Sequence, residues 1–341
     1  MSSNTTVFVS GATGFIAQHI VKLLIEQGYS VIGSVRSSQK GDQLKSDLKS
    51  LGLKSDSFSY EIVEDIVTKG AFDKALQSHP EISVFLHTAS PFHFDVKDVK
   101  SELLDPAVEG TNNALNAIKT YGKNIKRVVV TSSFAAVGRW GKYADPEATL
   151  TEKDWNPQTW EDSLENPLSG YLGSKKFAEK AAWEFVEKNN VGFKLSTVLP
   201  AYVFGPQLYQ VKDKSKLNTS SEILNGLIKL NSNDEIPDAT AWFIDVRDVA
   251  KAHLVAFEKE EAAGQRLILA AEPFSNQKIV KIIKADFPQL EEKLPKVDET
   301  KLKDYIRKEP TVNSDHTKKI LDFKYFDLKQ SVDDSVAQIL K

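Results

Sequence analysis

The chain contains no cysteine, and this absence excludes disulfide bonds, thiolate nucleophiles and zinc-thiolate sites. Its six histidines show neither an i, i+4 pair nor HExxH spacing, so no metal site is expected. A large excess of charge of one sign is also missing, because 44 Lys and Arg residues face 47 Asp and Glu residues. The net charge of −3 gives no reason to expect a nucleic-acid partner.

Long apolar segments are lacking too. The sequence contains no run long enough to span a bilayer, so no membrane partner is expected. The first strand is expected at Thr6, directly after a short polar leader that leaves no room for a signal or transit peptide. At 341 residues the chain can form a large α/β domain with a smaller lobe attached. We therefore expect a cytoplasmic protein.

The first two-thirds of the chain alternate short β-branched runs with amphipathic helices, from TVFVSG at residues 6–11 to KLSTVLP at residues 194–200. Such alternation is typical of a parallel sheet, and we predict a doubly wound α/β fold of Rossmann type. The Rossmann domain is predicted at residues 1–202, with residues 241–271 returning to it. A smaller, discontinuous substrate lobe is predicted at residues 203–240 and 272–341, over the sheet edge where open α/β sheets bind ligands.

A glycine-rich turn, GATGFIA at residues 11–17, lies between the first predicted strand and a predicted helix. Its missing side chains would let backbone N–H groups approach a pyrophosphate at the positive end of the helix. The segment GRWGKYA at residues 138–144 has the same glycine spacing but runs into Asp145 and Pro146 instead of a helix. Context therefore favours the first turn as a dinucleotide-binding site.

Arg36 follows the second predicted strand, where an NAD-selective site would place an acidic residue against the ribose 2′-hydroxyl. A carboxylate there would repel a 2′-phosphate, whereas a guanidinium offers donors that match it, and Lys40 can add a second cation. The sequence thus predicts NADPH as the cofactor. The alternative is a surface arginine at a strand end.

Two Tyr-x-x-x-Lys pairs occur, Tyr171 with Lys175 and Tyr325 with Lys329. The first pair opens a predicted long helix, where residues i and i+4 share one face. It also follows RVVVTSS, whose Ser133 lies just past an apolar strand. The second pair lacks such a serine, and we interpret it as lobe surface.

The first pair suggests a hypothesis for acid catalysis at a carbonyl group. Ser133 hydrogen-bonds the carbonyl oxygen, Tyr171 delivers a proton, and Lys175 lowers the pKa of Tyr171 while holding the nicotinamide ribose. The alternative is that Tyr171 and Lys175 merely belong to the polar face of an amphipathic helix.

Several segments together resemble the extended short-chain dehydrogenase/reductase superfamily. They are VFVSGATGFIAQHIV, FLHTASPF, RVVVTSS, SKKFAEKAAWEF, VFGPQ and IDVRDVAKAHLVAF. Within it, the chain is most similar to the yeast NADPH-dependent methylglyoxal and 3-methylbutanal reductases, relatives of plant dihydroflavonol reductase, from residue 6 to about residue 340. The resemblance implies a carbonyl reductase that converts aldehydes and ketones, such as 2-oxoaldehydes, 3-methylbutanal and hydrophobic ketones, to alcohols.

The resemblance also assigns residues to the site. Besides the catalytic set Ser133, Tyr171 and Lys175, it implies an apolar substrate pocket formed by Phe92, Phe134, Leu168, Tyr202 and Trp242. The implied NADPH contacts are Gly11, Thr13, Gly14, Phe15, Ile16, Arg36, Lys40, Asp65, Ile66, Thr88, Ala89, Ser90, Thr131, Tyr171, Lys175, Pro200 and Val203. One departure is Ala107, which stands where many members of the superfamily have a fourth catalytic residue, asparagine.

Two other functions stay open at this point. A sugar-nucleotide epimerase or dehydratase uses the same fold with tightly held NAD, and Arg36 and the apolar pocket argue against it. A non-catalytic redox sensor would bind NADP without turnover. The physiological carbonyl compound, the stereochemistry of the alcohol, any residual use of NADH and the choice between monomer and homodimer are not predicted.

Overall fold

A computed structural model describes residues 5–90, 96–209, 217–305 and 309–341. Its centre is a seven-stranded sheet in the order β10-β7-β5-β4-β1-β2-β3, with every neighbouring pair parallel. In chain order the strands are β1 (Thr6–Ser10), β2 (Ser30–Val35), β3 (Phe58–Ile62), β4 (Ile82–His87), β5 (Arg127–Thr131), β7 (Lys194–Pro200) and β10 (Arg266–Leu269). The predicted doubly wound Rossmann fold is confirmed.

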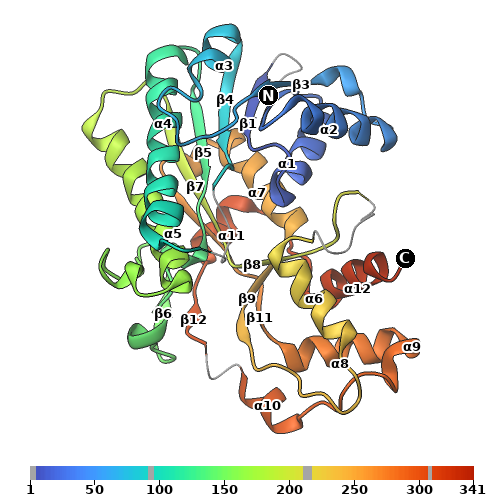
Figure 1. Cartoon of the computed structure of the whole chain (residues 1–341). Coiled ribbons are helices and arrows are strands. Elements are labelled where there is room, and N and C mark those ends of the chain that lie inside the picture. Colours follow the sequence, from blue (N-terminus) through green and yellow to red (C-terminus); the bar gives the residue numbers. More distant parts are fainter. Residues whose placement is uncertain (1–4, 91–95, 210–216, 306–308) are drawn as a thin grey trace.

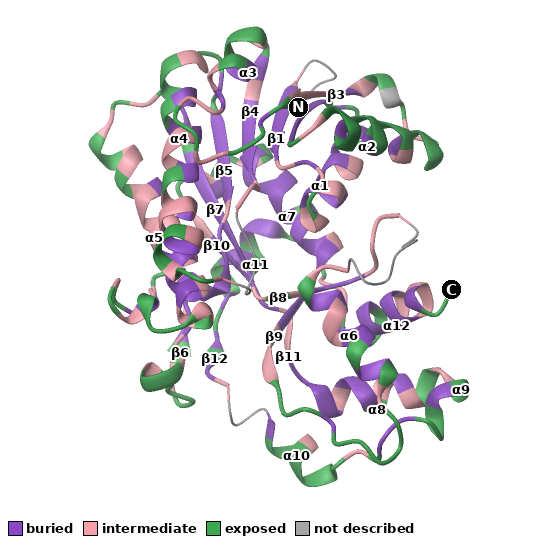
Figure 2. Cartoon of the chain, viewed as in Figure 1, coloured by how far each residue is buried: buried purple, intermediate pink, exposed green. Residues whose placement is uncertain are grey.

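Helices cover both faces of this sheet (Figure 1). On one face lie α1 (Phe15–Glu26), α2 (Ser38–Ser50), α7 (Val246–Glu258) and α11 (Asp315–Leu321). On the other lie α3 (Asp73–Ser78), α4 (Asp105–Tyr121) and α5 (Pro167–Lys188). Strand alternation explains the two layers, since Val7 and Val9 of β1 pack into the first cluster and Phe8 into the second. All the strands except the edge strand β3 are therefore largely buried on both sides (Figure 2).

A second, three-stranded sheet carries the lobe. It consists of β8 (Tyr202–Phe204), β9 (Thr240–Asp245) and β11 (Glu272–Ser275), in the order β11-β9-β8. Its apolar cluster includes side chains of α6 (Thr219–Lys229), α8 (Asn276–Asp286), α9 (Pro288–Glu291) and α12 (Leu328–Ile339). The last α-helix to name, α10 (Glu299–Asp304), contacts α8. A single residue, Ala201, separates β7 of the large sheet from β8 of the small one.

Short elements complete the described chain. The strands β6 (Thr149–Leu150) and β12 (Thr311–Val312) pair in parallel. The 3-10 helices are η1 (Ser55–Ser57), η3 (Phe134–Ala136), η4 (Gly141–Tyr143), η5 (Asp162–Leu164) and η7 (Glu260–Ala262), and η2 (Lys100–Leu104) is a π-helix. Within the segment predicted to return to the Rossmann domain, β10 belongs to the large sheet and α7 packs against that sheet, whereas β9 belongs to the small sheet. The exact domain limits stay a prediction.

The sheet order places a crevice between β1 and β4. The chain runs outward from β1 to β2 and β3 on one side and crosses over to β4, β5, β7 and β10 on the other. At such a switch point the loops after neighbouring strands diverge and leave room for a ligand. The glycine-rich turn follows β1 at this point. None of the helices in the described ranges is both long and apolar enough to cross a membrane.

Candidate active site

The turn after β1 brings backbone very close to backbone. Gly11 has a φ of +66°, and a Cβ atom built on it would lie 3.1 Å from the Cα of Ala89. Glycine is favoured there, because an L side chain would be strained at this φ and crowded by Ala89. The N–H of Gly14 closes the turn on the carbonyl of Gly11 at 2.9 Å, and α1 begins at the next residue. With no acidic residue in its first turn, this helix end is suited to an anion.

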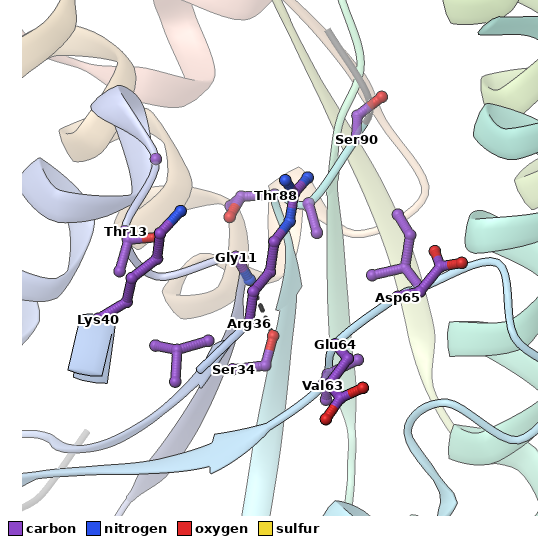
Figure 3. Close-up of a pocket in the computed structure, with 14 residues that line it drawn as sticks. Gly11, Thr13, Ser34, Arg36, Lys40, Val63, Glu64, Asp65, Thr88 and Ser90 are labelled. Carbon is purple, nitrogen blue, oxygen red and sulfur yellow. Dashed lines mark hydrogen bonds between the residues drawn. The ribbon is translucent and has the colours of Figure 1, made fainter. Parts of the chain in front are cut away.

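A cavity of about 530 Å³ opens beside this turn. Arg36 and Lys40 line it together with Thr13, and Asp65 lines it from the segment after β3 (Figure 3). Ser34 also lines it and accepts a hydrogen bond from the N–H of Gly11 at 2.9 Å. The two cations and the glycine turn line the same cavity and provide donors for both a terminal phosphate and a pyrophosphate.

A second cavity of about 400 Å³ continues from the first, since Gly14, Thr88 and Ser90 line both. It lies between the large sheet and the lobe, as β5, α5 and β7 contribute residues from one side and β8, α6 and β9 from the other. The catalytic candidates Ser133, Tyr171 and Lys175 all line it. The two cavities together form one continuous crevice.

The local sequence explains how the catalytic candidates meet. Asn166 caps α5 by accepting a hydrogen bond from the N–H of Ser169, which fixes the start of the helix. Tyr171 and Lys175 follow one turn apart on the same helix face. Ser133 caps η3, and its Oγ lies 3.5 Å from the hydroxyl oxygen of Tyr171.

Glu179 anchors this helix face one further turn along α5. Its fully buried carboxylate accepts hydrogen bonds from Ser132 Oγ at 2.7 Å, Thr197 Oγ1 at 2.9 Å and Arg266 Nε at 2.7 Å. These partners belong to the end of β5, to β7 and to β10. The contacts fix the register of α5 against three strands and so position the two catalytic candidates that precede Glu179.

Burial controls the acid–base properties of the pair. It raises the pKa of Tyr171, and the hydrogen bond with Ser133 offsets only part of this effect. It also lowers the pKa of Lys175 to about 8. The sequence hypothesis assigns Lys175 the opposite effect on the tyrosine, a lowered pKa. The pKa of Tyr171 rises because burial destabilises the phenolate by more than the hydrogen bond with Ser133 stabilises it.

The structure brings the predicted site residues together. All seventeen predicted cofactor residues and four of the five predicted substrate residues line one of the two cavities. The fifth, Phe92, lies outside the described residues. Their individual roles stay predictions. Lining residues that the sequence did not indicate are Ser34, Val35, Val63, Glu64, Ala17, Ser132, Ala135, Trp140, Leu172, Ala201, Asn218, Thr219, Ser220, Ala241 and Glu309.

Comparison with known proteins places this architecture. A family model described as the NAD dependent epimerase/dehydratase family matches residues 7–270. The chain belongs to this family. A relative in this family, the putative NADPH-dependent methylglyoxal reductase of Candida albicans, is 62% identical over 340 residues and covers 100% of both chains. The NADPH-dependent methylglyoxal reductase of Saccharomyces cerevisiae is 47% identical and covers 98% of each.

Solved structures agree with these relatives. The crystal structure of Gre2 from Candida albicans in complex with NADPH matches with a TM-score of 0.94 and 53% identity over 98% of each chain. Yeast methylglyoxal/isovaleraldehyde reductase complexed with NADPH matches with a TM-score of 0.92 and 46% identity, again over 98% of each. The epimerase/dehydratase fold of this chain is therefore shown over nearly its whole length.

Buried polar residues behind the crevice support the strand ends in this family member. Ser10 Oγ accepts hydrogen bonds from the N–H groups of Thr88 and Ala89, each at 3.0 Å, and lies 3.0 Å from His87 Nδ1. These contacts hold the end of β4 against the end of β1. Burial lowers the pKa of His87 to about 4, so the imidazole is neutral at pH 7.

Thr131, at the end of β5, is oriented by a buried histidine. His253 Nδ1 lies 2.8 Å from the carbonyl oxygen of Val249, which can only accept, so this nitrogen carries the proton. The other ring nitrogen, 2.7 Å from Thr131 Oγ1, must then accept from the threonine hydroxyl. Sequence reasoning passed over Ser10, Ser34 and His253. Their signal is a polar side chain inside an otherwise apolar strand or helix face.

Proposed function

We propose that this chain reduces aldehydes and ketones to alcohols with NADPH, and that Tyr171 is the general acid. The observation that carries the proposal is the Tyr171 hydroxyl, 3.5 Å from Ser133 Oγ, in a cavity continuous with the dinucleotide crevice. Two relatives named as NADPH-dependent methylglyoxal reductases support it, with identities of 62% and 47% over almost the whole chain.

The residues around the crevice fit NADPH. Gly11, with its positive φ, permits the tight turn before α1, the start of α1 carries no acidic residue, and Arg36 and Lys40 supply positive charge in the same cavity. When bound, NADPH supplies a hydride to the carbonyl carbon of the substrate. Arg36 and Lys40 would hold its 2′-phosphate, and Lys175 its nicotinamide ribose.

The protein's own groups manage the proton. Ser133 donates a hydrogen bond to the substrate carbonyl oxygen. As the carbonyl group is reduced, this oxygen gains the charge of an alkoxide, and Tyr171 donates its phenolic proton to it. The raised pKa of Tyr171 keeps the phenol protonated before the reaction, as a general acid requires. An alkoxide is a much stronger base than a phenolate, so the transfer is downhill. Lys175, with a pKa of about 8, is mostly cationic at pH 7 and stabilises the phenolate that remains.

The direct test is NADPH oxidation by purified protein in the presence of methylglyoxal or 3-methylbutanal, with a carbonyl-free control. We expect carbonyl-dependent oxidation with both compounds and with hydrophobic ketones, because aromatic and aliphatic residues form much of the second cavity. Tight NADPH binding without turnover would instead indicate a redox sensor. Co-purification of NAD would indicate an epimerase or dehydratase. Either result overturns the reductase proposal.

The cofactor preference tests Arg36 separately. Arg36→Ala should raise the KM for NADPH about tenfold or more and change the KM for NADH little, because the guanidinium contacts only the 2′-phosphate in the proposed mode. Initial rates at saturating methylglyoxal measure both constants. An NADH preference in the wild-type protein would contradict the assignment.

We place the protein in the cytoplasm, where a reduced NADPH pool drives carbonyl reduction. Imaging of a C-terminal fluorescent fusion tests this placement, and an organellar pattern would refute it.

A further inference from the structure

The second cavity has an uneven distribution of charge. Among the described residues that line it, the acidic and basic side chains are those of Glu309 and Lys175. Lys175 stands on α5 beside Tyr171. Glu309 comes from a segment more than 130 residues later, immediately before β12, and shares the lobe side of the cavity with Trp242. The proposed reaction uses Lys175 and leaves Glu309 without a role.

Contacts on both sides hold Glu309 in place. Thr240 Oγ1 donates a hydrogen bond to Glu309 Oε1 at 2.6 Å, and Trp242 Nε1 donates to the carbonyl oxygen of Pro310 at 2.9 Å. Thr240 and Trp242 are two residues apart on β9, so their side chains project from the same face of the strand. The chain then continues into β12, which pairs with β6. The carboxylate is therefore positioned by a sheet on either side.

The charge of Glu309 acts on Tyr202, a neighbour in the same cavity. Burial raises the pKa of Tyr202, and the carboxylate of Glu309 raises it further. Burial raises the pKa of Glu309 overall, and the hydrogen bond from Thr240, which favours the ionised form, offsets only part of this effect. Thr240 occupies only Oε1. A ligand in the cavity can use the other carboxylate oxygen as an acceptor.

We propose that Glu309 is a specificity-determining residue that favours carbonyl compounds with a hydroxyl group at the end remote from the carbonyl and rejects those with a carboxylate there. This inference rests on the proposed reductase function. A remote hydroxyl donates to Glu309 Oε2, and so offsets the loss of water around the carboxylate. A remote carboxylate meets the like charge of the partly buried Glu309, where repulsion is stronger than in bulk water. A substrate with an alkyl group at the remote end should be accepted less well than the hydroxyl compound and better than the carboxylate, because it desolvates Glu309 without forming a new hydrogen bond.

The test compares matched substrates of two lengths. One pair is 6-hydroxyhexan-2-one and 5-oxohexanoate, and the second pair is lengthened by three methylene groups. For wild-type protein we expect kcat/KM to favour the hydroxyketone over the oxo acid in at least one pair. Glu309→Gln, which keeps the shape and removes the charge, should raise kcat/KM for the oxo acid about tenfold, mainly through KM. Glu299→Gln removes a charge from α10, where Glu299 pairs with Lys281 at 3.1 Å outside the cavity, and should leave the ratio unchanged.

A second variant keeps the proposal testable if Glu309→Gln does not fold. Thr240→Val leaves the charge in place and removes its hydrogen bond, so the ratio should fall only partway toward that of Glu309→Gln. Unchanged ratios in both variants overturn the role of Glu309 while the reductase function stands. Failure of wild-type protein to turn over any ketone or aldehyde overturns the function and the role together.

Discussion

The two Tyr-x-x-x-Lys pairs have the same spacing and opposite surroundings. Tyr171 and Lys175 lie on one face of α5 and line the second cavity. Tyr325 precedes α12, and only Lys329 is part of that helix, so the second pair does not share a helix face. Spacing of four residues joins two side chains only where both belong to one helix.

The lysines differ most. Burial lowers the pKa of Lys175 to about 8. Lys329 is solvent-exposed and forms ion pairs with Asp286 and Asp333, each at 2.7 Å, which raise its pKa. Tyr325 packs edge-on against Phe323 with ring centroids 5.6 Å apart, in the cluster beneath the large sheet. Two carboxylates already neutralise the charge of Lys329, so this lysine could not stabilise a phenolate. Within the described ranges no carboxylate is an ion-pair partner of Lys175, so its charge can act on a phenolate at Tyr171.

The largest expected effect is a loss of kcat on replacing Tyr171 by phenylalanine, and the same replacement of Tyr325 is the control. Tyr171→Phe removes the proton donor and should lower kcat about 10²–10⁴-fold, the usual contribution of a general acid. Tyr325→Phe, the matched control, should keep kcat within about twofold, because its ring stays packed and its hydroxyl is not used. NADPH oxidation with methylglyoxal measures kcat, and fluorescence titration checks that NADPH still binds. Similar losses in both variants would erase the distinction between the pairs.

The lysines should give the next largest effect. Lys175→Met keeps the length of the side chain but removes the cation that stabilises the phenolate, so kcat/KM should fall about 10²-fold. The KM for NADPH should rise as well if Lys175 holds the ribose. Lys329→Met should leave both constants unchanged. A Lys175→Met enzyme with wild-type kcat/KM would show that the helix alone, without the charge, positions the acid.

A smaller effect concerns stability against pH. The pKa of Lys175 falls from 10.5 in the unfolded chain to about 8 in the folded protein. Between these values the unfolded chain binds more protons, so the free energy of unfolding rises with pH. From pH 8 to 9.5 the gain is roughly 1.5 kcal/mol relative to Lys175→Met.

Lys329 provides the control for this pH dependence. Its folded pKa is raised, so its stabilising contribution is complete below the unfolded pKa and is lost only as pH rises through the folded value, above this window. Lys329→Met should therefore follow the wild-type slope. Urea unfolding of the three proteins between pH 7.5 and 9.5 measures the slopes. Parallel slopes for wild type and Lys175→Met would contradict the buried-lysine interpretation.

The sequence predicted the large sheet and most of the crevice, because both depend on local patterns. β-branched runs alternate with helices, and the ligand-facing residues stand just after strands, as Gly11, Arg36 and Thr88 do. Glu309 was not predicted for a different reason. Its proposed role depends on a contact with the distant Thr240, and no local sequence pattern indicates such a contact.

Gly14, Thr88 and Ser90, which the two cavities share, have a consequence for kinetics. A dinucleotide that spans the junction becomes a wall of the second cavity. A carbonyl compound that arrives first meets an incomplete pocket with an open side. Addition is therefore expected in a fixed sequence, cofactor before substrate, with the alcohol leaving before the oxidised cofactor. We therefore expect the junction formed by Gly14, Thr88 and Ser90 to determine the order in which cofactor and substrate bind.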